Sequence, residues 1–526
     1  MFDIFGTLKE KIESQYVICI VSGVVCGIIT HLYMLTHKLP NWDDVNNVNG
    51  EGSGAFLGRW FLKYIHPIGG STSMPAVHGF LAILIISLTA CMILKIMNLK
   101  SVTVSVLVPV LFVTFPSLAC TMTFMFMAHT SAIAIFMVCF AVFLLREYKF
   151  GCIFSTILLI CSMGIYQSYM SFAIALMLMG MIMDIFRDKP FIKVVKQGFV
   201  CVGTLLVSVV VYMRLCYVFY PAMATESYGG ISEMGQIRIQ EVPIMVGRCY
   251  KRFLEYFLLK PFSFVTPTMH KMNIAICVLA VVLFVYIVVV RKIWKEKLSL
   301  ALLIILCGFI PLAVAFVYFM APTAPFSMLM LYAYVLIFVM VLGLLEVCFE
   351  YWNKTTFNIK WKKNLVQSVT LVTVAVVCIS CHSSYLLTNK AYLRMEVSYE
   401  RVTSYFNRIL TRVEATEGFQ NGEPVALLGE FYYATNPAPV EMDAFYTENL
   451  REMSGVALEN GLITSGVRDN FIKTYVGFDV GETTFEEKKA IMLTSEFADM
   501  PVYPTEGCIK KIDGIWVVKL CDTIPN

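Results

Sequence analysis

Long apolar runs, separated by short polar connections, fill the first three quarters of the chain. A lipid bilayer offers the backbone no water to bond with, so its ~30 Å core is crossed by helices of about 20 mostly apolar residues. Each run is therefore predicted to be a membrane-spanning helix. The eleven predicted spans lie at approximately 16–36, 75–94, 101–119, 122–145, 151–166, 168–186, 198–219, 272–290, 298–319, 327–349 and 365–387.

The distribution of positive charge predicts the orientation of these spans. Lys and Arg collect in every second connection, and cytoplasmic loops are the ones that retain positive charge during insertion. The connection RKIWKEK at 291–297 is strongly basic, whereas those at 115–122 and 320–326 carry no Lys or Arg. This pattern places the N-terminus in the cytoplasm and the long loops 37–74 and 220–271 outside. The first run lacks a small-residue cleavage site and is interpreted as an anchor.

The composition changes after residue 388, where charged residues become frequent and apolar runs shrink to strand length. Residues 391–415 carry the three- and four-residue spacing of an amphipathic helix, and 425–429 and 514–520 read as buried strands. Asp513-Gly514 favours a hairpin turn. The sequence thus predicts a polytopic α-helical membrane domain (1–388) with about 11 transmembrane helices, followed by a small extracytoplasmic α/β domain (389–526). Cys508 and Cys521 either pair there or remain thiols.

Composition narrows the class of protein further. The 526 residues are 58% hydrophobic and only 15% charged, which excludes a cytosolic enzyme and a disordered chain. The net charge of +4 is spread between apolar runs, so no nucleic-acid partner is expected. The expected partner is the lipid bilayer.

Candidate chemistry is concentrated in the first outer loop. Asp43 and Asp44 stand side by side just beyond the first span, and Arg59 and His66 follow in the same loop. An Asp-Asp step is also an ordinary helix cap or solvated turn. The alternative is sugar transfer from a polyprenyl phosphate, which needs a carboxylate as general base and a cation for the departing phosphate. Asp43 or Asp44 would be the base and Arg59 the cation; whether the two carboxylates hold a divalent metal ion stays open.

The second outer loop and one short connection supply further candidates. Arg248, Lys251 and Arg252 lie in an amphipathic segment that either binds the donor phosphate or directs its cations to lipid headgroups. The tyrosines of the GIYQSY connection at 164–169 either belong to the aromatic belt of the membrane or bind sugar. The substrate-binding candidates are His66, Tyr166, Gln167, Glu226 and Tyr228, with Gln236 as a further sugar-hydroxyl partner.

The order of these features resembles the bacterial type II Gtr glucosyltransferases, which have the GT-C membrane architecture. The resemblance rests on Asp43-Asp44 followed by Gly58-Arg59-Trp60, on Tyr166-Gln167, on Asn389-Lys390-Ala391-Tyr392, and on the ending at 500–520. Some relatives carry Arg shortly after the acidic pair, where this chain has Asn46 and Asn47, which leaves phosphate recognition to Arg59 or the second loop.

The resemblance implies a transferase that takes glucose from undecaprenyl-phosphate-glucose on the outer face of the bacterial plasma (inner) membrane. The acceptor would be a surface polysaccharide such as O-antigen or teichoic acid, or its lipid-linked precursor. No cofactor besides the lipid donor is implied, and a donor synthase and a donor flippase are expected partners.

Two other functions remain as alternatives at this stage. One is a polymerase or ligase of lipid-linked glycans on the same fold. The other is a flippase or transporter, which should show internal repeats or ionisable groups near the membrane midplane. The spans contain no convincing repeat and no paired midplane charges, whereas the acidic pair lies in an outer loop. The sequence therefore favours the transferase.

Overall fold

The computed structural model describes residues 13–50, 52, 54–221, 239–259, 262, 264–355, 360–429, 450, 452–456 and 459–522. The chain divides into two compact units. Unit 1 comprises Met1–Lys38, Asn49–Lys390 and Glu448–Ser454. Unit 2 comprises Leu39–Val48, Ala391–Thr447 and Gly455–Asn526, so the segment with the acidic pair belongs to the same unit as the C-terminal region.

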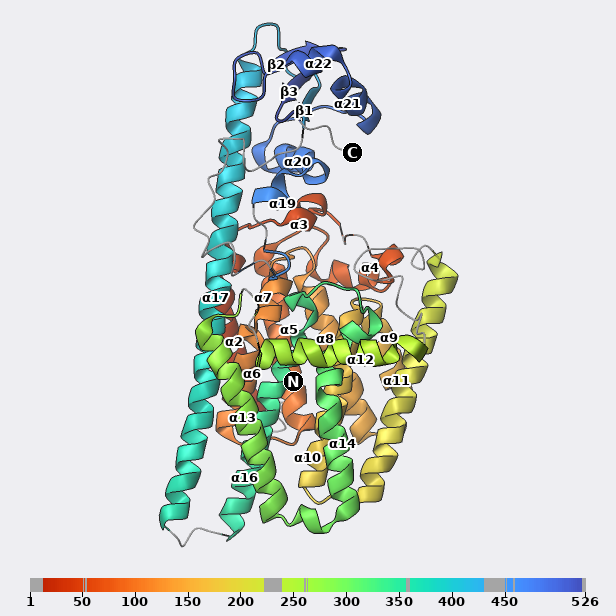
Figure 1. Cartoon of the computed structure of the whole chain (residues 1–526), viewed down its shortest axis with the longest axis vertical. Helices are drawn as coiled ribbons and strands as arrows, with labels where there is room; N and C mark the ends of the chain where they lie inside the picture. Colours follow the sequence, from red (N-terminus) through yellow and green to blue (C-terminus); the bar gives the residue numbers. More distant parts are fainter. Residues whose placement is uncertain are drawn as a thin grey trace, which may run out of the picture. The chain divides into compact units, whose positions relative to one another are not determined.

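The described part of unit 1 is a bundle of membrane helices, drawn in Figure 1. Nine described helices are long and apolar enough to cross a bilayer. They are α2 (Ser14–Thr36), α5 (Pro75–Ile96), α8 (Ala128–Glu147), α10 (Met170–Phe186), α11 (Phe191–Phe219), α13 (Pro267–Val290), α14 (Lys297–Val314), α16 (Val335–Thr355) and α17 (Lys360–Glu414). The polytopic helical fold predicted from the sequence is confirmed.

Two of the eleven predicted spans differ from these helices. The run at 101–119 is broken into α6 (Val102–Thr114) and α7 (Pro116–Met122), which meet at 49° and make a tenth candidate span if counted together. The break falls at Phe115, which takes an extended conformation because Pro116 follows it. The run at 151–166 forms only the short helix α9 (Gly151–Met163).

Helix α17 joins two elements that the sequence presented as separate. The predicted span 365–387 and the predicted amphipathic helix 391–415 form one helix of 55 residues. Residues 360–414 contain neither Gly nor Pro, so nothing in the backbone chemistry interrupts the helix at the polar Asn389-Lys390 step. The helix belongs to unit 1 up to Lys390 and to unit 2 from Ala391.

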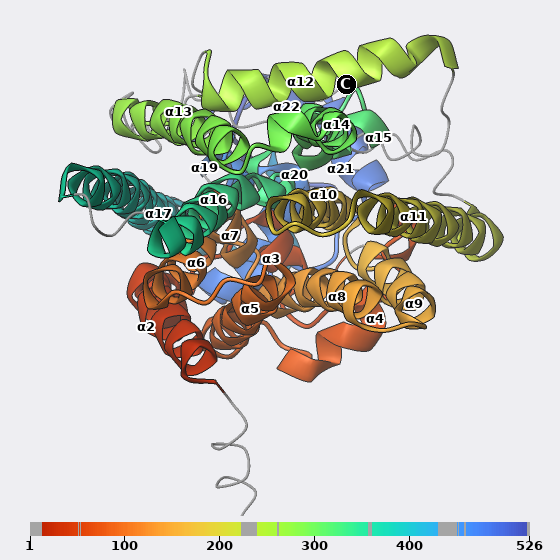
Figure 2. The same cartoon turned by 90° about the horizontal axis from the view of Figure 1, so that it is seen from below.

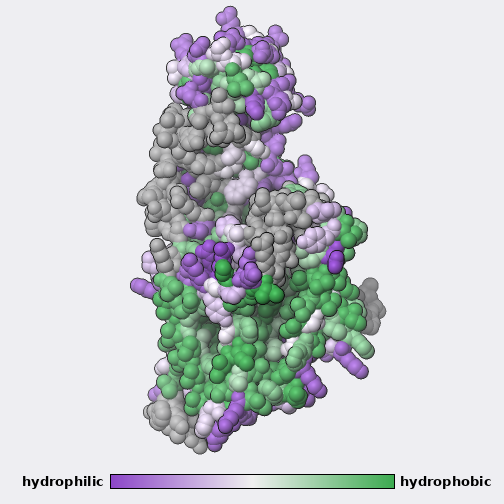
Figure 3. Space-filling view, turned by 45° about the vertical axis from the view of Figure 1, so that its right-hand side comes forward, coloured by the Kyte–Doolittle hydropathy of each residue, from purple (hydrophilic) through white to green (hydrophobic). Residues whose placement is uncertain are grey.

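The membrane helices of unit 1 fall into an inner and an outer set. In α10 and α16 about nine tenths of the apolar segment is buried, whereas in α11, α13 and α14 less than a third is buried. The outer helices present apolar side chains such as Val210, Val281 and Ile304, and Figure 3 shows a broad apolar surface over this unit. Helix α12 (Val242–Phe257) instead runs crosswise to α13 and α14 (Figures 1 and 2).

A short piece of the C-terminal chain also packs within unit 1. The backbone N–H of Met328 donates to the carbonyl of Glu452 (3.2 Å), and the hydroxyls of Ser327 and Ser454 lie 2.6 Å apart. Met453 is buried beside them. The chain therefore returns from unit 2 to unit 1 before it completes the C-terminal sheet.

The described sheet of unit 2 has three strands in the order β1–β3–β2. β1 (Val425–Leu428) pairs parallel with β3 (Ile515–Lys519), and β2 (Ile509–Ile512) pairs antiparallel with β3. The hairpin turn is the predicted Asp513-Gly514, where both residues have positive φ, as a two-residue turn of this kind requires. The strands predicted at 425–429 and 514–520 are confirmed.

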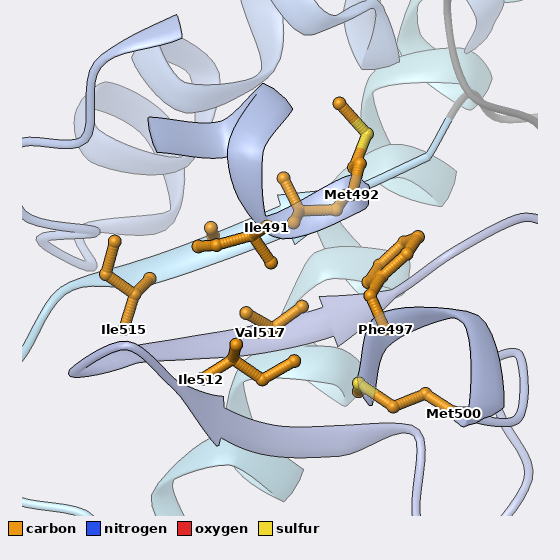
Figure 4. Packing of buried hydrophobic residues seen from close by; sticks show 9 residues of the cluster. Ile491, Met492, Phe497, Met500, Ile512, Ile515 and Val517 are labelled. Atoms are coloured by element: carbon orange, nitrogen blue, oxygen red, sulfur yellow. The ribbon is translucent and has the colours of Figure 1, made fainter. Parts of the chain in front are cut away.

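An apolar core forms where short helices cover this sheet. α21 (Phe485–Met492) and α22 (Ser495–Asp499) place Ile491, Met492 and Phe497 against the strands. Figure 4 shows these side chains meeting Ile512, Ile515 and Val517 of the hairpin. Two more helices, α19 (Glu459–Ile463) and α20 (Ser465–Phe471), belong to the same unit. The buried Arg468 ties α20 to the sheet by donating to the carbonyl of Leu427 (2.6 Å).

Candidate functional site

The acidic pair opens a short helix, α3 (Trp42–Asn46), in unit 2. Asn41 is its N-cap, and its side-chain oxygen accepts from the backbone N–H groups of Asp43 and Asp44, both at 2.9 Å. The carboxylate of Asp44 accepts in return from the N–H of Asn41 (3.3 Å), which completes a capping box. Asp44 is fully buried.

Asp43 occupies a different environment from its neighbour. It is half-buried, and the capping box uses the carboxylate of Asp44 and not that of Asp43. Successive residues of a helix diverge by ~100°, so the two carboxylates point in different directions. Asn47 fixes the helix end by donating to the backbone carbonyl of Asp43 (2.7 Å). The pair thus separates into a structural cap and a carboxylate that the cap does not use.

Helix α3 packs on α19 and α20 of the same unit. The side chain of Asn46 donates to the carbonyl of Gly466 (3.4 Å) and accepts from the side chain of Asn470 (2.9 Å). Trp42 covers Gly461 so closely that a Cβ there would lie 2.9 Å from the indole. Residues more than 400 positions away in the sequence therefore hold the acidic segment.

Tyr475 adds an electrostatic link to this packing. Burial raises the pKa of its hydroxyl, and the negative charge of Asp44 raises that pKa further. Both effects keep Tyr475 neutral at ordinary pH. The charge of the cap carboxylate thus acts on a phenol of the same unit.

Arg59 lies in unit 1, where the structure brings together two motifs that are far apart in the sequence. The amide of Gln167 donates to the carbonyl of Leu57 (2.6 Å) and to the hydroxyl of Tyr212 (2.9 Å). Tyr212 donates in turn to the carbonyl of Gly58 (3.0 Å). The backbone just before Arg59 is therefore held by one residue of the Tyr166-Gln167 step and one of α11.

The guanidinium of Arg59 lies over the ring of Tyr166, 5.0 Å from the centroid. Its Nε is buried, and no hydrogen-bond partner for it is found among the described residues. No carboxylate in the described part of the chain forms an ion pair with it within 4.0 Å. A half-buried cation that is held by an aromatic ring and has no carboxylate partner in the described part of the chain is suited to an anionic ligand.

The cations of the second outer loop lie on α12, also in unit 1. Arg252 pairs with Glu255 (3.1 Å) and stacks over the ring of Tyr318 at 5.4 Å. Lys251 approaches the same Glu255 at 3.8 Å and is largely exposed. Arg248 is exposed and donates to the backbone carbonyl of Pro322. Of the three, only Arg252 is both partly buried and held against an aromatic ring.

Arg252 and Arg59 share one arrangement. The guanidinium of Arg252 lies over the ring of Tyr318, and that of Arg59 lies over the ring of Tyr166.

Comparison with known families decides what kind of protein this is. The sequence model described as glucosyl transferase GtrII matches residues 32–342, which is more than half of the chain and includes α3, Arg59 and α12. The chain belongs to the GtrII glucosyl transferase family. It is accordingly a glycosyltransferase embedded in a membrane. Searches of curated proteins and of solved structures return no match.

The remaining predicted residues of this GtrII chain fall into two groups. His66 is buried, its Nε2 lies 3.0 Å from the carbonyl of Phe126, and its ring lies beside those of His78 and His129. His66 is thus engaged within the fold, and it has no role in the reaction proposed for this protein. Glu226, Tyr228 and Gln236 lie outside the described residues.

A metal site finds little support in the part of the GtrII chain that the structure describes. No group of three or more His, Cys, Asp or Glu residues there is arranged to hold an ion. One carboxylate of the acidic pair is already engaged as a helix cap. No residue is therefore assigned to a metal.

Sequence reasoning missed the residues that support the candidates. Tyr212 was read only as part of an apolar span, and Asn46 only as the place where some relatives carry Arg. Trp42, Gly461 and Asn470 carry no local signal of their pairing, because their partners are remote in sequence. A polar hydroxyl in a membrane helix was the one available hint, since such groups need a partner.

Proposed function

We propose that this GtrII protein transfers a glucosyl group from a polyprenyl-phosphate donor, undecaprenyl-phosphate-glucose, to a cell-surface polysaccharide or its lipid-linked precursor. The reaction would take place at the outer face of the bacterial plasma membrane, on a GT-C-like scaffold. The observation that carries the proposal is Arg59, a half-buried cation without a carboxylate partner among the described residues. It lies next to the ends of membrane helices, where a lipid phosphate is the natural anion.

In the proposed reaction Asp43 takes the proton of an acceptor hydroxyl. The hydroxyl oxygen attacks the anomeric carbon as the bond from that carbon to the phosphate oxygen breaks. The polyprenyl phosphate leaves with the bonding electrons, and its charge changes from −1 to −2. Arg59, assisted by Arg252, stabilises the charge that develops. A single base without a covalent nucleophile gives inversion at the anomeric carbon.

Within this proposal the two carboxylates have separate roles. Asp44 closes the capping box and fixes the start of α3, which makes it a positioning residue. Asp43 would be the catalytic residue because its carboxylate is outside the box and half-buried. A general base that is partly shielded from water and close to its acceptor accelerates transfer by about 10²–10⁴-fold.

The test uses purified full-length protein in liposomes with labelled undecaprenyl-phosphate-glucose and extracted surface glycan. Asp43→Asn should lower kcat by at least about 10²-fold at an unchanged KM for the donor. Arg59→Gln should lower kcat/KM by a similar factor, with partial recovery in Arg59→Lys. The matched control is Lys63→Gln, an exposed cation of the same loop.

Undiminished transfer by Asp43→Asn would refute the assignment of the base. Movement of the donor across the bilayer without transfer to any acceptor would refute the transferase and favour a flippase. Joining of whole glycan chains would favour a polymerase or ligase.

A further inference from the structure

A second feature of unit 1 is an apolar cavity of 330 Å³ that is lined by Gln167 and Tyr212, the residues that hold the backbone before Arg59. Its walls come from the end of α9, from α10, from α11 and from the chain at α15 (Val317–Met320). Figure 2 shows α11 beside α9 and α10. The apolar walls include Met170, Ile174, Leu206, Val209, Phe316 and Phe319.

Among the described residues that line this cavity, two have polar side chains, Gln167 and Tyr212. They are the residues that hold the carbonyls of Leu57 and Gly58, the two positions before Arg59. The polar side of the cavity therefore adjoins the backbone that precedes Arg59. An apolar space whose two polar side chains hold the backbone next to a cation matches an amphiphile with an apolar chain and an anionic group.

The cavity is also accessible from the lipid side of α11. Leu206 lines it and is 61% exposed, and Val202 lines it and is 55% exposed. Its volume is at the lower end of the ~300–1,000 Å³ typical of small-molecule sites, so it holds only the first part of a long chain. The rest of such a chain would leave through the α11 side into the bilayer.

We propose that this cavity binds the phosphate-proximal isoprene units of the polyprenyl donor, with the phosphate at Arg59. This inference rests on the proposed function, because it names the place of the donor tail. It also assigns a role to Gln167 and Tyr212: they close the apolar space and position Arg59.

The experiment places a photoreactive side chain at two neighbouring positions of α11 in the full-length protein in liposomes. Val209→p-benzoylphenylalanine lies in the cavity wall. Val210→p-benzoylphenylalanine is the matched control, because Val210 is 58% exposed, does not line the cavity and points ~100° away. The probe is labelled undecaprenyl phosphate, and the competitors are unlabelled undecaprenyl phosphate and phosphatidylglycerol.

We expect at least fivefold more labelling at position 209 than at 210, with competition by undecaprenyl phosphate and not by phosphatidylglycerol. Val209→Trp, which fills the cavity, should weaken binding of undecaprenyl phosphate about tenfold, or ~1.4 kcal/mol, and Val210→Trp should not. Equal labelling at both positions, or equal competition by phosphatidylglycerol, would overturn the inference.

The outcomes separate this inference from the proposed function. Specific labelling at 209 in a protein that never transfers sugar would leave the tail site standing and refute the transferase role. Normal transfer and normal binding in Val209→Trp would refute the tail site alone. The Val209→Trp and Val210→Trp proteins should be compared with the parent protein for yield and for insertion into the membrane.

Discussion

At the scale of single residues, the capping box of α3 predicts that the two neighbouring aspartates respond differently to substitution. Asp44→Ala removes the acceptor for the N–H of Asn41 and should destabilise α3 by ~1 kcal/mol. Amide hydrogen exchange in residues 41–47 should then accelerate about fivefold. Asp44→Asn retains a carbonyl oxygen as acceptor and should therefore destabilise α3 less than Asp44→Ala does.

The control for this prediction is Asp43→Ala, which leaves the box intact and should not change exchange in α3. Equal acceleration by both substitutions would contradict the division of roles between them.

Part of this candidate site could be predicted from the sequence. An acidic pair, a following arginine and a Tyr-Gln step were visible as unusual polar residues at membrane edges. Which carboxylate becomes the cap depends on the position of Asn41 at the helix start, and capping is a known alternative use of Asp. Contacts such as Gln167 with Leu57 could not be predicted, because they join segments whose pairing has no local signature.

At the scale of elements, the packing of α3 on α19 predicts contrasting effects for two glycines. A methyl group at Gly461 would lie 2.9 Å from the indole of Trp42, whereas one at Gly466 would meet no atom within 4 Å. Gly461→Ala should therefore displace α3 and reduce transfer several-fold. Gly466→Ala should be neutral or stabilise α20, since Ala favours a helix by up to ~1 kcal/mol over Gly.

The measurement is transfer activity in liposomes together with binding of undecaprenyl phosphate. Binding should be unchanged in both glycine variants, because the proposed donor residues belong to unit 1. Full activity in Gly461→Ala would show that α3 tolerates displacement.

The edge of the C-terminal sheet predicts a pH dependence. Lys511 and then Trp516 lower the pKa of Glu423 from 4.5 to about 2. Because that pKa is lower than in the unfolded chain, its contribution to stability is present above about pH 4.5 and is lost as the pH falls toward 2. Between pH 5 and pH 2.5, amide exchange in β3 should rise more in the parent protein than in Glu423→Gln.

Glu496→Gln is the control for this pH dependence, because its pair with Lys510 (3.4 Å) is exposed on both sides. It should show the same response to pH as the parent protein. A parent response identical to that of Glu423→Gln would contradict the role of Glu423.

Elements were the level at which the sequence was most informative. Apolar runs predicted the membrane helices because length and hydropathy are local properties. Two of the three departures have local causes too: Pro116 splits one run, and the absence of Gly and Pro fuses α17 across a polar step. The continuity of α17 was not predicted, because a change in composition suggests a domain boundary but does not require the helix to end there.

At the scale of the whole molecule, the charge pattern predicts a topology that labelling can check. Asn49→Cys lies in the first outer loop, and Lys149→Cys lies in a connection predicted to be cytoplasmic; both positions are exposed. On intact cells, a membrane-impermeant maleimide should label the Asn49→Cys protein more strongly than the parent protein. The Lys149→Cys protein should be labelled above that background only after the membrane is opened. The reverse result would refute the proposed reaction at the outer face.

The two units could not be delimited in full from the sequence. A change in composition near residue 388 was visible, but the return of Glu448–Ser454 to unit 1 and the membership of Leu39–Val48 in unit 2 were not. Both depend on contacts between segments that are remote in the chain. Such contacts are set by packing and not by local pattern.

The membership of α3 in unit 2 has a practical consequence for protein engineering. A protein shortened at residue 390 would retain the membrane helices up to that point and lose α19 and α20, the surface on which the acidic helix rests. Likewise, a chimera with the C-terminal region of a related transferase would need residues 39–48 from that same transferase, because the two segments fold together as one unit.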